Sequence, residues 1–168
     1  VVVFSFILMS FSSNGQKVFW SKLLGGSAWD YGISIFATED TNYLISGLYG
    51  SSDGDFPGFH GSQDYWVAKL DKEGNILWGK CLGGSGADLK YSANIINNEY
   101  VLIGSSTSND GDASGNHGSY DIWIAGVDTA GILKWQKSFG GSSMDVGTCI
   151  VGTDDGGMIM SGYAVSND

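Results

Sequence analysis

Side chains alternate between two faces along several short stretches of the chain, and polar turns separate these stretches. Alternation of this kind predicts β-strands. In one part of the chain it predicts strands at residues 31–38, 42–49, 64–70 and 76–82. Short polar turns join the first two and the last two of them, as in tight hairpins. No helical periodicity competes with this pattern, so we expect an all-β protein.

The same pattern of strands is repeated along the chain with a period of 57 or 58 residues. Three tryptophans mark the period, at positions 20, 78 and 135. Each is followed by a lysine, by Gly-Gly-Ser and by an aspartate (Asp30, Asp88 and Asp145). Each copy then has a glycine that ends an apolar run, followed by a Ser-x-Asp. A period of this length predicts supersecondary units that stack or surround an axis.

Four antiparallel strands in one such period, with a Gly-Gly-Ser link into the next copy, predict the blade of a β-propeller. The units are approximately residues 20–77, 78–134 and 135–168. The chain would then hold about two complete blades and a partial third, whereas a ring needs at least about four. We therefore expect a fragment that is completed by further blades of the same parent chain. The alternative is a short chain that closes its ring by oligomerising.

The first fifteen residues do not follow the repeat. An apolar run at residues 1–11 is followed by small residues, Ser13 and Gly15, at the positions that a signal peptidase reads. We interpret residues 1–15 as a truncated signal peptide, with the repeats occupying 16–168. The run is too short for a comfortable membrane span, so we expect no membrane insertion. An N-terminal β-strand is the alternative interpretation. Export predicts a secreted or cell-surface location.

Charge narrows the choice of partner. The chain carries a formal net charge of −10 and has a pI near 4.3, which argues against nucleic acid and against anionic membranes. Cations and neutral ligands are easier to accommodate, and an extracellular protein or a glycan is the expected partner. Cys81 and Cys149 occupy different phases of the repeat, which excludes a bridge in every unit. We expect two buried small residues, or else an incidental disulfide.

A calcium loop is the sharpest candidate site. Counted from Asp110, oxygen-bearing residues stand at positions one, three, five, seven and twelve, with glycine at six, which is the spacing of an EF-hand loop. The predicted ligands are Asp110, Asp112, Ser114, Asn116 and Asp121. The first copy keeps Asp53, Asp55 and Asp64 but has Pro57 at position five, so it should bind calcium more weakly or not at all.

Two features of these loops favour a different interpretation. The last ligand is an aspartate instead of the longer glutamate, and no flanking helices are expected. Aspartates in glycine-rich loops also cap turns by accepting hydrogen bonds from backbone N–H groups. His60 and His117 hold the same place in two copies, which favours a structural role because a catalytic histidine is normally unique. Neither a serine nucleophile elbow nor a phosphate loop is present, so we expect no enzyme.

Several segments resemble a known family, the bacterial SBBP-type β-propeller repeats. They are DYWVAKLD at 64–71, GNILW at 74–78, LGGS at 82–85 and the Phe56-Pro57 pair. The text from Ser108 to Gly118 is similar to a variant common in large secreted and surface proteins, some of which end in a type IX secretion sorting domain. The resemblance covers everything after residue 19. It implies a propeller fold and an extracellular setting.

Together these features predict a non-enzymatic exported propeller that acts as a scaffold or adhesive binding module, with loops that calcium could stabilise. The alternative is that these blades belong to an enzyme acting on extracellular polysaccharide, a glycoside hydrolase or lyase. A loop insertion that breaks the regularity of the repeat would favour the enzyme, and the sequence contains none.

Overall fold

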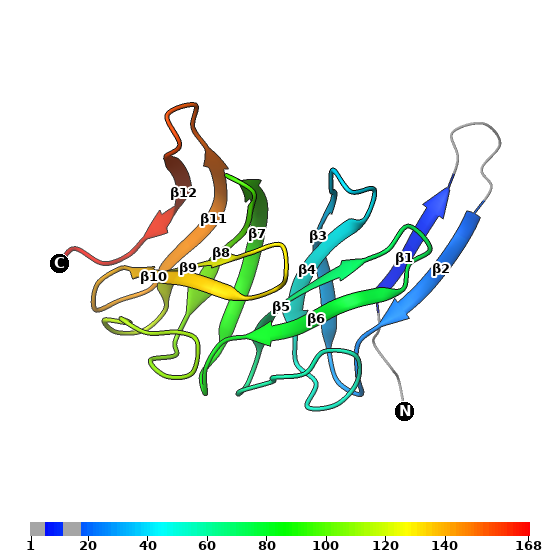
Figure 1. The fold of residues 1–168 in the computed structure, drawn as a ribbon. Helices are drawn as coiled ribbons and strands as arrows, with labels where there is room; N and C mark the ends of the chain where they lie inside the picture. Colours follow the sequence, from blue (N-terminus) through cyan, green and yellow to red (C-terminus); the bar gives the residue numbers. More distant parts are fainter. Residues whose placement is uncertain (1–5, 12–17) are drawn as a thin grey trace.

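Strands account for all the regular secondary structure in the computed structural model, which describes residues 6–11 and 18–168 (Figure 1). The first sheet contains β3 (Asp30–Ala37), β4 (Tyr43–Tyr49), β5 (Asp64–Leu70) and β6 (Ile76–Leu82). The second sheet contains β7 (Asp88–Ile96), β8 (Glu99–Ser106), β9 (Asp121–Val127) and β10 (Leu133–Phe139). Two-stranded sheets flank them, formed by β1 (Phe6–Phe11) with β2 (Val18–Leu24) and by β11 (Asp145–Gly152) with β12 (Met158–Ala164).

The alternation of side chains predicted these strands well. Each four-stranded sheet is an antiparallel meander in which neighbours in sequence are neighbours in space. β5 and β6 have the predicted bounds. β3 begins and ends one residue earlier than predicted, because Asp30 already pairs with Tyr49 and Thr38 belongs to the turn, where its N–H bonds to the carbonyl of Asn42. The prediction of an all-β fold is confirmed for the described residues.

The repeat is also visible in the structure. Trp78 is the third residue of β6 and Trp135 is the third residue of β10, at the same place in two sheets with the same strand order. The first strand of each copy, β3, β7 and β11, has a register shift at the same point, next to Gly32, Lys90 and Gly147. Equivalent sequence therefore gives equivalent structure in successive copies.

The first and second sheets pack face to face through a shared apolar core. Tyr65 on β5 places its ring 4.5 Å from that of Trp123 on β9, and its hydroxyl donates to the Trp123 carbonyl at 3.1 Å. The alternate residues of β5 face away from this core and join a second cluster, with Leu24 on β2. Because it is covered on both faces, β5 is buried along its whole length.

A tryptophan on the last strand of one sheet contacts the last turn of the following sheet. The indole N–H of Trp20 donates to the carbonyl of Lys72 at 2.9 Å, and that of Trp78 donates to the carbonyl of Thr129 at 3.2 Å. Each turn carries a glycine with φ of 83°, Gly74 or Gly131, and a Cβ there would lie within 3 Å of the indole ring. Both the backbone conformation and the close approach of the ring require glycine.

Residues predicted to form a signal peptide take part in one sheet. Phe6–Phe11 form β1, which pairs with β2 from Phe6 opposite Leu24 to Phe11 opposite Val18. Residues 1–5 and 12–17, which include the remainder of that segment, lie outside the described residues. The signal peptide stays a prediction. No helix in the described part of the chain is long and apolar enough to span a membrane.

The prediction for the two cysteines is half correct. Both thiols are free, Cys81 is buried as predicted, and Cys149 is exposed. Cys81 lies in β6, where the second apolar cluster covers it. Cys149 lies in β11, whose sheet contains one other strand, and the side chains of β12 are exposed along that strand. The phase of the repeat could not indicate how many strands cover the last copy.

Candidate functional site

Each sheet has two ends with different character. Asp30, Tyr49 and Asp64 lie side by side where β3 starts, β4 ends and β5 starts. We call this the link end, because the Gly-Gly-Ser links and the long loops meet there. Ala37 pairs with Tyr43 at the opposite end, which carries the tight hairpins and which we call the turn end. The predicted calcium ligands therefore lie at the link end.

A buried aspartate organises the link end of the first sheet. Its carboxylate, on Asp30, accepts hydrogen bonds from the N–H of Gly26 at 2.7 Å, the N–H of Gly50 at 3.0 Å and the hydroxyl of Ser51 at 2.8 Å. Ser51 in turn accepts from the N–H of Ala28 at 2.9 Å. These bonds tie the Gly-Gly-Ser link to the loop that follows β4. We call the arrangement the link clasp.

The second sheet contains the same clasp around Asp88, which is fully buried. Its carboxylate accepts from the N–H of Gly84 at 2.8 Å and from the hydroxyls of Ser106 and Ser108, the latter at 3.0 Å. Every donor belongs either to the link or to the segment that ends β8. The clasp therefore holds together two segments about twenty residues apart in sequence.

A third clasp surrounds Asp145, which accepts from the N–H of Gly141 at 2.9 Å and from the hydroxyl of Ser166 at 2.7 Å. The same residue types in different surroundings titrate differently. The bond from Ser166 lowers the pKa of Asp145, whereas burial raises the pKa of Asp88. Both carboxyl groups are inaccessible to solvent, so the difference lies in the balance of two effects: desolvation outweighs the hydrogen bonds at Asp88, and the hydrogen bonds outweigh desolvation at Asp145.

The exposed aspartates of the Ser-x-Asp motifs cap the same links. Asp53 accepts from the N–H of Ser27 at 2.8 Å, and Asp110 accepts from the N–H of Ser85 at 2.7 Å. Asp168 repeats the bond in the third copy. These bonds to backbone N–H lower the pKa of all three carboxyl groups. The interpretation of these aspartates as turn caps is confirmed for Asp53 and Asp110.

The remaining predicted ligands contact separate partners. The hydroxyl of Ser114 accepts from the side chain of Gln136 at 2.6 Å, and the side-chain N–H₂ of Asn116 donates to the carbonyl of Ser106 at 2.8 Å. Asp55 accepts from the N–H of Gly25 at 2.9 Å. No hydrogen bond to the carboxylate of Asp112 is formed by the described residues, and its N–H donates to the carbonyl of Gly83.

Asp64 and Asp121, the last predicted ligand of each loop, are fully buried and pair with the repeated histidines. His60 bonds to Asp64 through both its N–H at 2.8 Å and its Nδ1 at 3.0 Å, and His117 bonds to Asp121 in the same way. Burial raises the pKa of Asp64. Each histidine thus fixes its own loop to the start of the third strand, which is a structural use.

These contacts bear on how well the loops suit a metal ion. Among residues 6–11 and 18–168, no group of three or more His, Cys, Asp or Glu side chains is placed to hold one. Asp110, Ser114 and Asn116 bond to different partners in this conformation, so binding calcium would require them to exchange those partners. Among the described residues, no hydrogen bond is donated to the carboxylate of Asp112 or to Oδ1 of Asp121. Calcium binding stays a prediction.

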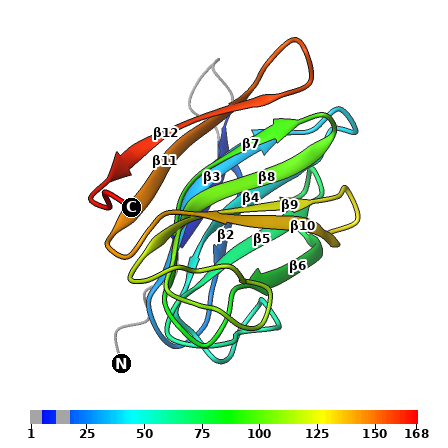
Figure 2. The ribbon, with the colours of Figure 1, turned by 90° about the vertical axis from the view of Figure 1, so that its left-hand side faces the viewer.

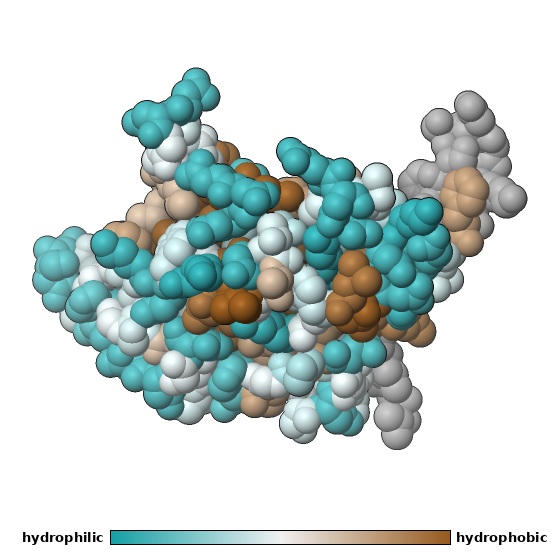
Figure 3. All heavy atoms as spheres, viewed as in Figure 1, coloured by the Kyte–Doolittle hydropathy of each residue, from teal (hydrophilic) through white to brown (hydrophobic). Residues whose placement is uncertain are grey.

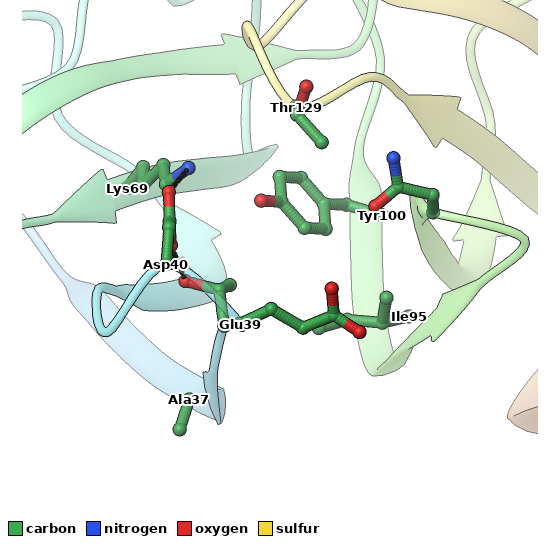
Figure 4. Close-up of a pocket in the computed structure, with 9 residues that line it drawn as sticks. Ala37, Glu39, Asp40, Lys69, Ile95, Tyr100 and Thr129 are labelled. Carbon is green, nitrogen blue, oxygen red and sulfur yellow. Dashed lines mark hydrogen bonds and ion pairs between the residues drawn. The ribbon is translucent and has the colours of Figure 1, made fainter.

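Sequence reasoning missed a hollow of about 530 Å³ at the turn end, between the first and second sheets (Figure 4). It is formed by residues from both sheets and from the turns β3–β4, β7–β8 and β9–β10. Its lining consists of Ala37, Thr38, Glu39, Asp40, Lys69, Ile95, Asn98, Tyr100 and Thr129. A concave surface of this size is within the range of small-ligand sites.

An ion pair between two residues of the first sheet, one in β5 and one in the turn β3–β4, lies on one side of the hollow (Figure 4). Lys69 Nζ lies 2.6 Å from Asp40 Oδ2, and only 11% of the Lys69 side chain is exposed. The hydrogen bond from Lys69 holds the pKa of Asp40 well below its usual range, and the same bond raises the pKa of Lys69. The hydroxyl of Tyr100 points toward this pair, and the side chain of Glu39 extends along the opening (Figure 4).

The hollow offers both donors and acceptors of hydrogen bonds, with two carboxylates against one ammonium group. The turn β3–β4 beside it is hydrophilic, as is the corresponding turn β11–β12 (Figure 3). A signal was present in the sequence, since Lys69 is the one charged residue after Asp64 in a strand that is otherwise apolar or aromatic. Its partner could not be identified, because Asp40 is in a different hairpin.

Comparisons with known proteins were made for the whole chain. No protein-family model matches it, and no curated protein has a significantly similar sequence. Function is therefore inferred from the residues and their geometry.

Proposed function

We propose that this chain is a secreted or cell-surface β-propeller repeat module that acts as a scaffold and binds a neutral glycan at its turn end. Two features support a propeller: the two four-stranded meanders pack face to face, and the copies repeat structural contacts, with the clasp present in all three and the tryptophan contact made by Trp20 and Trp78. The predicted signal peptide and the resemblance to SBBP-type repeats support the extracellular setting.

The observation that carries the proposed binding function is the hollow between the two four-stranded sheets. It combines the Lys69–Asp40 pair, the Tyr100 hydroxyl and the amide of Asn98 in one concave surface. Sugar hydroxyls both donate and accept hydrogen bonds, as these groups do. The excess of carboxylates and the net charge of −10 disfavour sulfated or other acidic glycans. A neutral oligosaccharide is the ligand that this chemistry suits.

Replacing Tyr100 with phenylalanine tests this site. The change removes one hydroxyl from the hollow, and we expect the affinity for a neutral oligosaccharide to fall by about tenfold, the usual scale for losing one buried hydrogen bond. The measurement is isothermal titration calorimetry with a panel of neutral oligosaccharides. Tyr43→Phe is the matched control, since Tyr43 holds the place of Tyr100 in the first sheet and lies outside the hollow.

Two results would count against the glycan site. One is the absence of heat with every neutral oligosaccharide at millimolar concentration. The other is binding that both substitutions weaken equally, which would show that the loss does not depend on the hollow. Preferential binding of an acidic glycan would contradict the argument from charge. In that case the effect of Tyr100→Phe on the affinity for that glycan would show whether it binds in the hollow.

Calcium is proposed as a stabiliser of the loop at residues 110–121, at the millimolar affinity typical of extracellular sites. We expect added calcium to release or absorb heat and to raise the melting temperature. Asp112→Asn should abolish both effects, because it removes the carboxylate that the described residues leave without a hydrogen bond. Asp55→Asn, in the first copy with Pro57, should keep them. The absence of heat and of a melting shift at several millimolar calcium would exclude this site.

A further inference from the structure

A lysine is fully buried between the first strands of the two four-stranded sheets. Lys90 lies in β7, its exposed fraction is 0%, and its Nζ donates to Ser34 Oγ in β3 at 2.9 Å. β3 and β7 lie next to each other, with β11 beyond β7 (Figure 2). Lysine is among the residues least often buried without a charged partner. In the described part of the chain no carboxylate forms an ion pair with Lys90.

The repeat shows that this lysine is not needed for the fold. Lys90 pairs with Gly104 across its sheet, Gly32 pairs with Gly47 in the first sheet, and Gly147 holds the same place in β11. Two of the three copies therefore have glycine where the second has lysine. A residue that differs in one copy, at a cost in buried charge, is more typical of function than of the repeated framework.

The surroundings of Lys90 favour its neutral form. Burial lowers the pKa of Lys90 to about 7, with no other cause contributing. On β5 the hydroxyl of Tyr65 lies near the backbone of Lys90, since a Cβ on Gly104 would contact both. This hydroxyl donates to the Trp123 carbonyl, and burial raises the pKa of Tyr65 well above its usual value. A neutral amine that lies 2.9 Å from a hydroxyl can accept its proton, as in serine–lysine pairs.

We propose that Ser34 is a nucleophilic hydroxyl activated by Lys90, and that it accepts acyl groups from esters. Ser34 Oγ attacks the carbonyl carbon while Lys90 Nζ takes the hydroxyl proton. The bond from the carbonyl carbon to the leaving oxygen then breaks, and the ammonium group returns the proton to that oxygen. The products are an ester on Ser34 and a free alcohol or phenol, and Lys90 is neutral again.

An ester can approach Ser34, because that residue is partly exposed and β3 is the first strand of its sheet, with no strand on its other side in the described part of the chain. Apolar side chains of β3 are exposed beside it: Tyr31, on the same face of the sheet, is 43% exposed, and Ile33, at the register shift, is 40% exposed. This surface favours an ester with a small apolar acyl group and an aryl leaving group. The proposal is independent of the glycan site at the turn end.

The chain provides an internal control. Ser92 holds in β7 the place that Ser34 holds in β3, directly after the register shift. The residue that corresponds to Lys90 in the following sheet is Gly147, so no amine is supplied to Ser92 at that position. Ser34 and Ser92 thus share their fold environment and differ in the presence of the lysine.

The test is acetylation of the whole chain by p-nitrophenyl acetate, followed by peptide mapping. We expect Ser34 to be acetylated at least about tenfold faster than Ser92. Its rate should rise with pH through the pKa of about 7, as Lys90 loses its proton. Lys90→Met, which keeps an unbranched side chain one atom shorter and removes the base, should lower the Ser34 rate to that of Ser92. Ser34→Ala should abolish the fast release of nitrophenol.

Three results would overturn the proposal. They are equal acetylation of the two serines, an unchanged Ser34 rate in Lys90→Met, and acetylation of Lys90 itself in place of Ser34, which would make the amine the nucleophile. Circular dichroism establishes that each variant is folded. If Lys90→Met does not fold, two measurements on the unsubstituted chain still decide the outcome. They are the acetylated residues found by peptide mapping and the pH dependence of the Ser34 acetylation rate.

Discussion

Replacing Asp88 with alanine is expected to destabilise the protein by about 4 kcal/mol. The buried carboxylate accepts hydrogen bonds from Gly84, Ser106 and Ser108, and its loss would leave one N–H and two hydroxyl groups without an acceptor. Each orphaned buried donor costs about 1–3 kcal/mol, and partial relaxation reduces the sum. The free energy of unfolding can be measured by urea denaturation, with tryptophan fluorescence as the signal.

Asp110→Ala is the matched control for Asp88. Asp110 belongs to the same loop and also accepts a hydrogen bond from the link, from the N–H of Ser85. Because Asp110 is exposed, water can replace its carboxylate as the acceptor, and the loss of folding stability should be much smaller. The destabilisation by Asp88→Asn should lie between those of Asp88→Ala and Asp110→Ala, since the amide keeps one acceptor oxygen but replaces the other with an N–H₂ group facing the N–H and hydroxyl donors. Equal destabilisation by Asp88→Ala and Asp110→Ala would show that burial of the clasp does not determine its contribution.

Trp123→Ala should destabilise the protein by about 3–5 kcal/mol. The side chain is fully buried where the first and second sheets meet, its ring lies 4.5 Å from that of Tyr65, and its Nε1 donates to Gln136 at 2.9 Å. Truncation would remove apolar contacts from both sheets and leave a cavity between them. Urea denaturation, followed by circular dichroism because a fluorophore is lost, measures the change.

The control for Trp123 is Trp29→Ala, because Trp29 is 57% exposed in the link of the first sheet. Surface substitutions usually change stability by about 0.5 kcal/mol or less. A loss at Trp29 as large as that at Trp123 would contradict the assignment of the core to the interface between the sheets.

The strands could be predicted because their signals are local. Alternation along 64–70 and 76–82 and the glycine-bearing turn between them are short-range features, and the period of the tryptophans extended them to each copy. The extent to which each strand is buried was harder to predict from the sequence. β5 is covered on both faces by residues from three sheets, whereas Cys149 is exposed, and neither fact is encoded near the residue concerned.

The candidate site was harder to predict, since its partners are distant in sequence. The spacing from Asp110 to Asp121 fits calcium ligands and turn caps equally well. The donor that Asp110 meets is the N–H of Ser85, 25 residues earlier, which the loop alone cannot reveal. The ion pair in the hollow likewise joins Asp40 and Lys69, which belong to different hairpins. Lys90 was detectable, because aligning the copies places it against Gly32 and Gly147.

The contacts of the tryptophans and the clasps have an evolutionary consequence. Each clasp closes within one copy, and Trp20 and Trp78 reach the turn of the following sheet in the same way, so the two junctions that flank the first four-stranded sheet are made of the same two halves. Trp135 instead donates to Glu99. A gene that gains or loses one copy by unequal recombination would encode a junction that already fits. Copy number can therefore drift without compensating substitutions, and surface residues such as those of the turns can diversify on an unchanged framework.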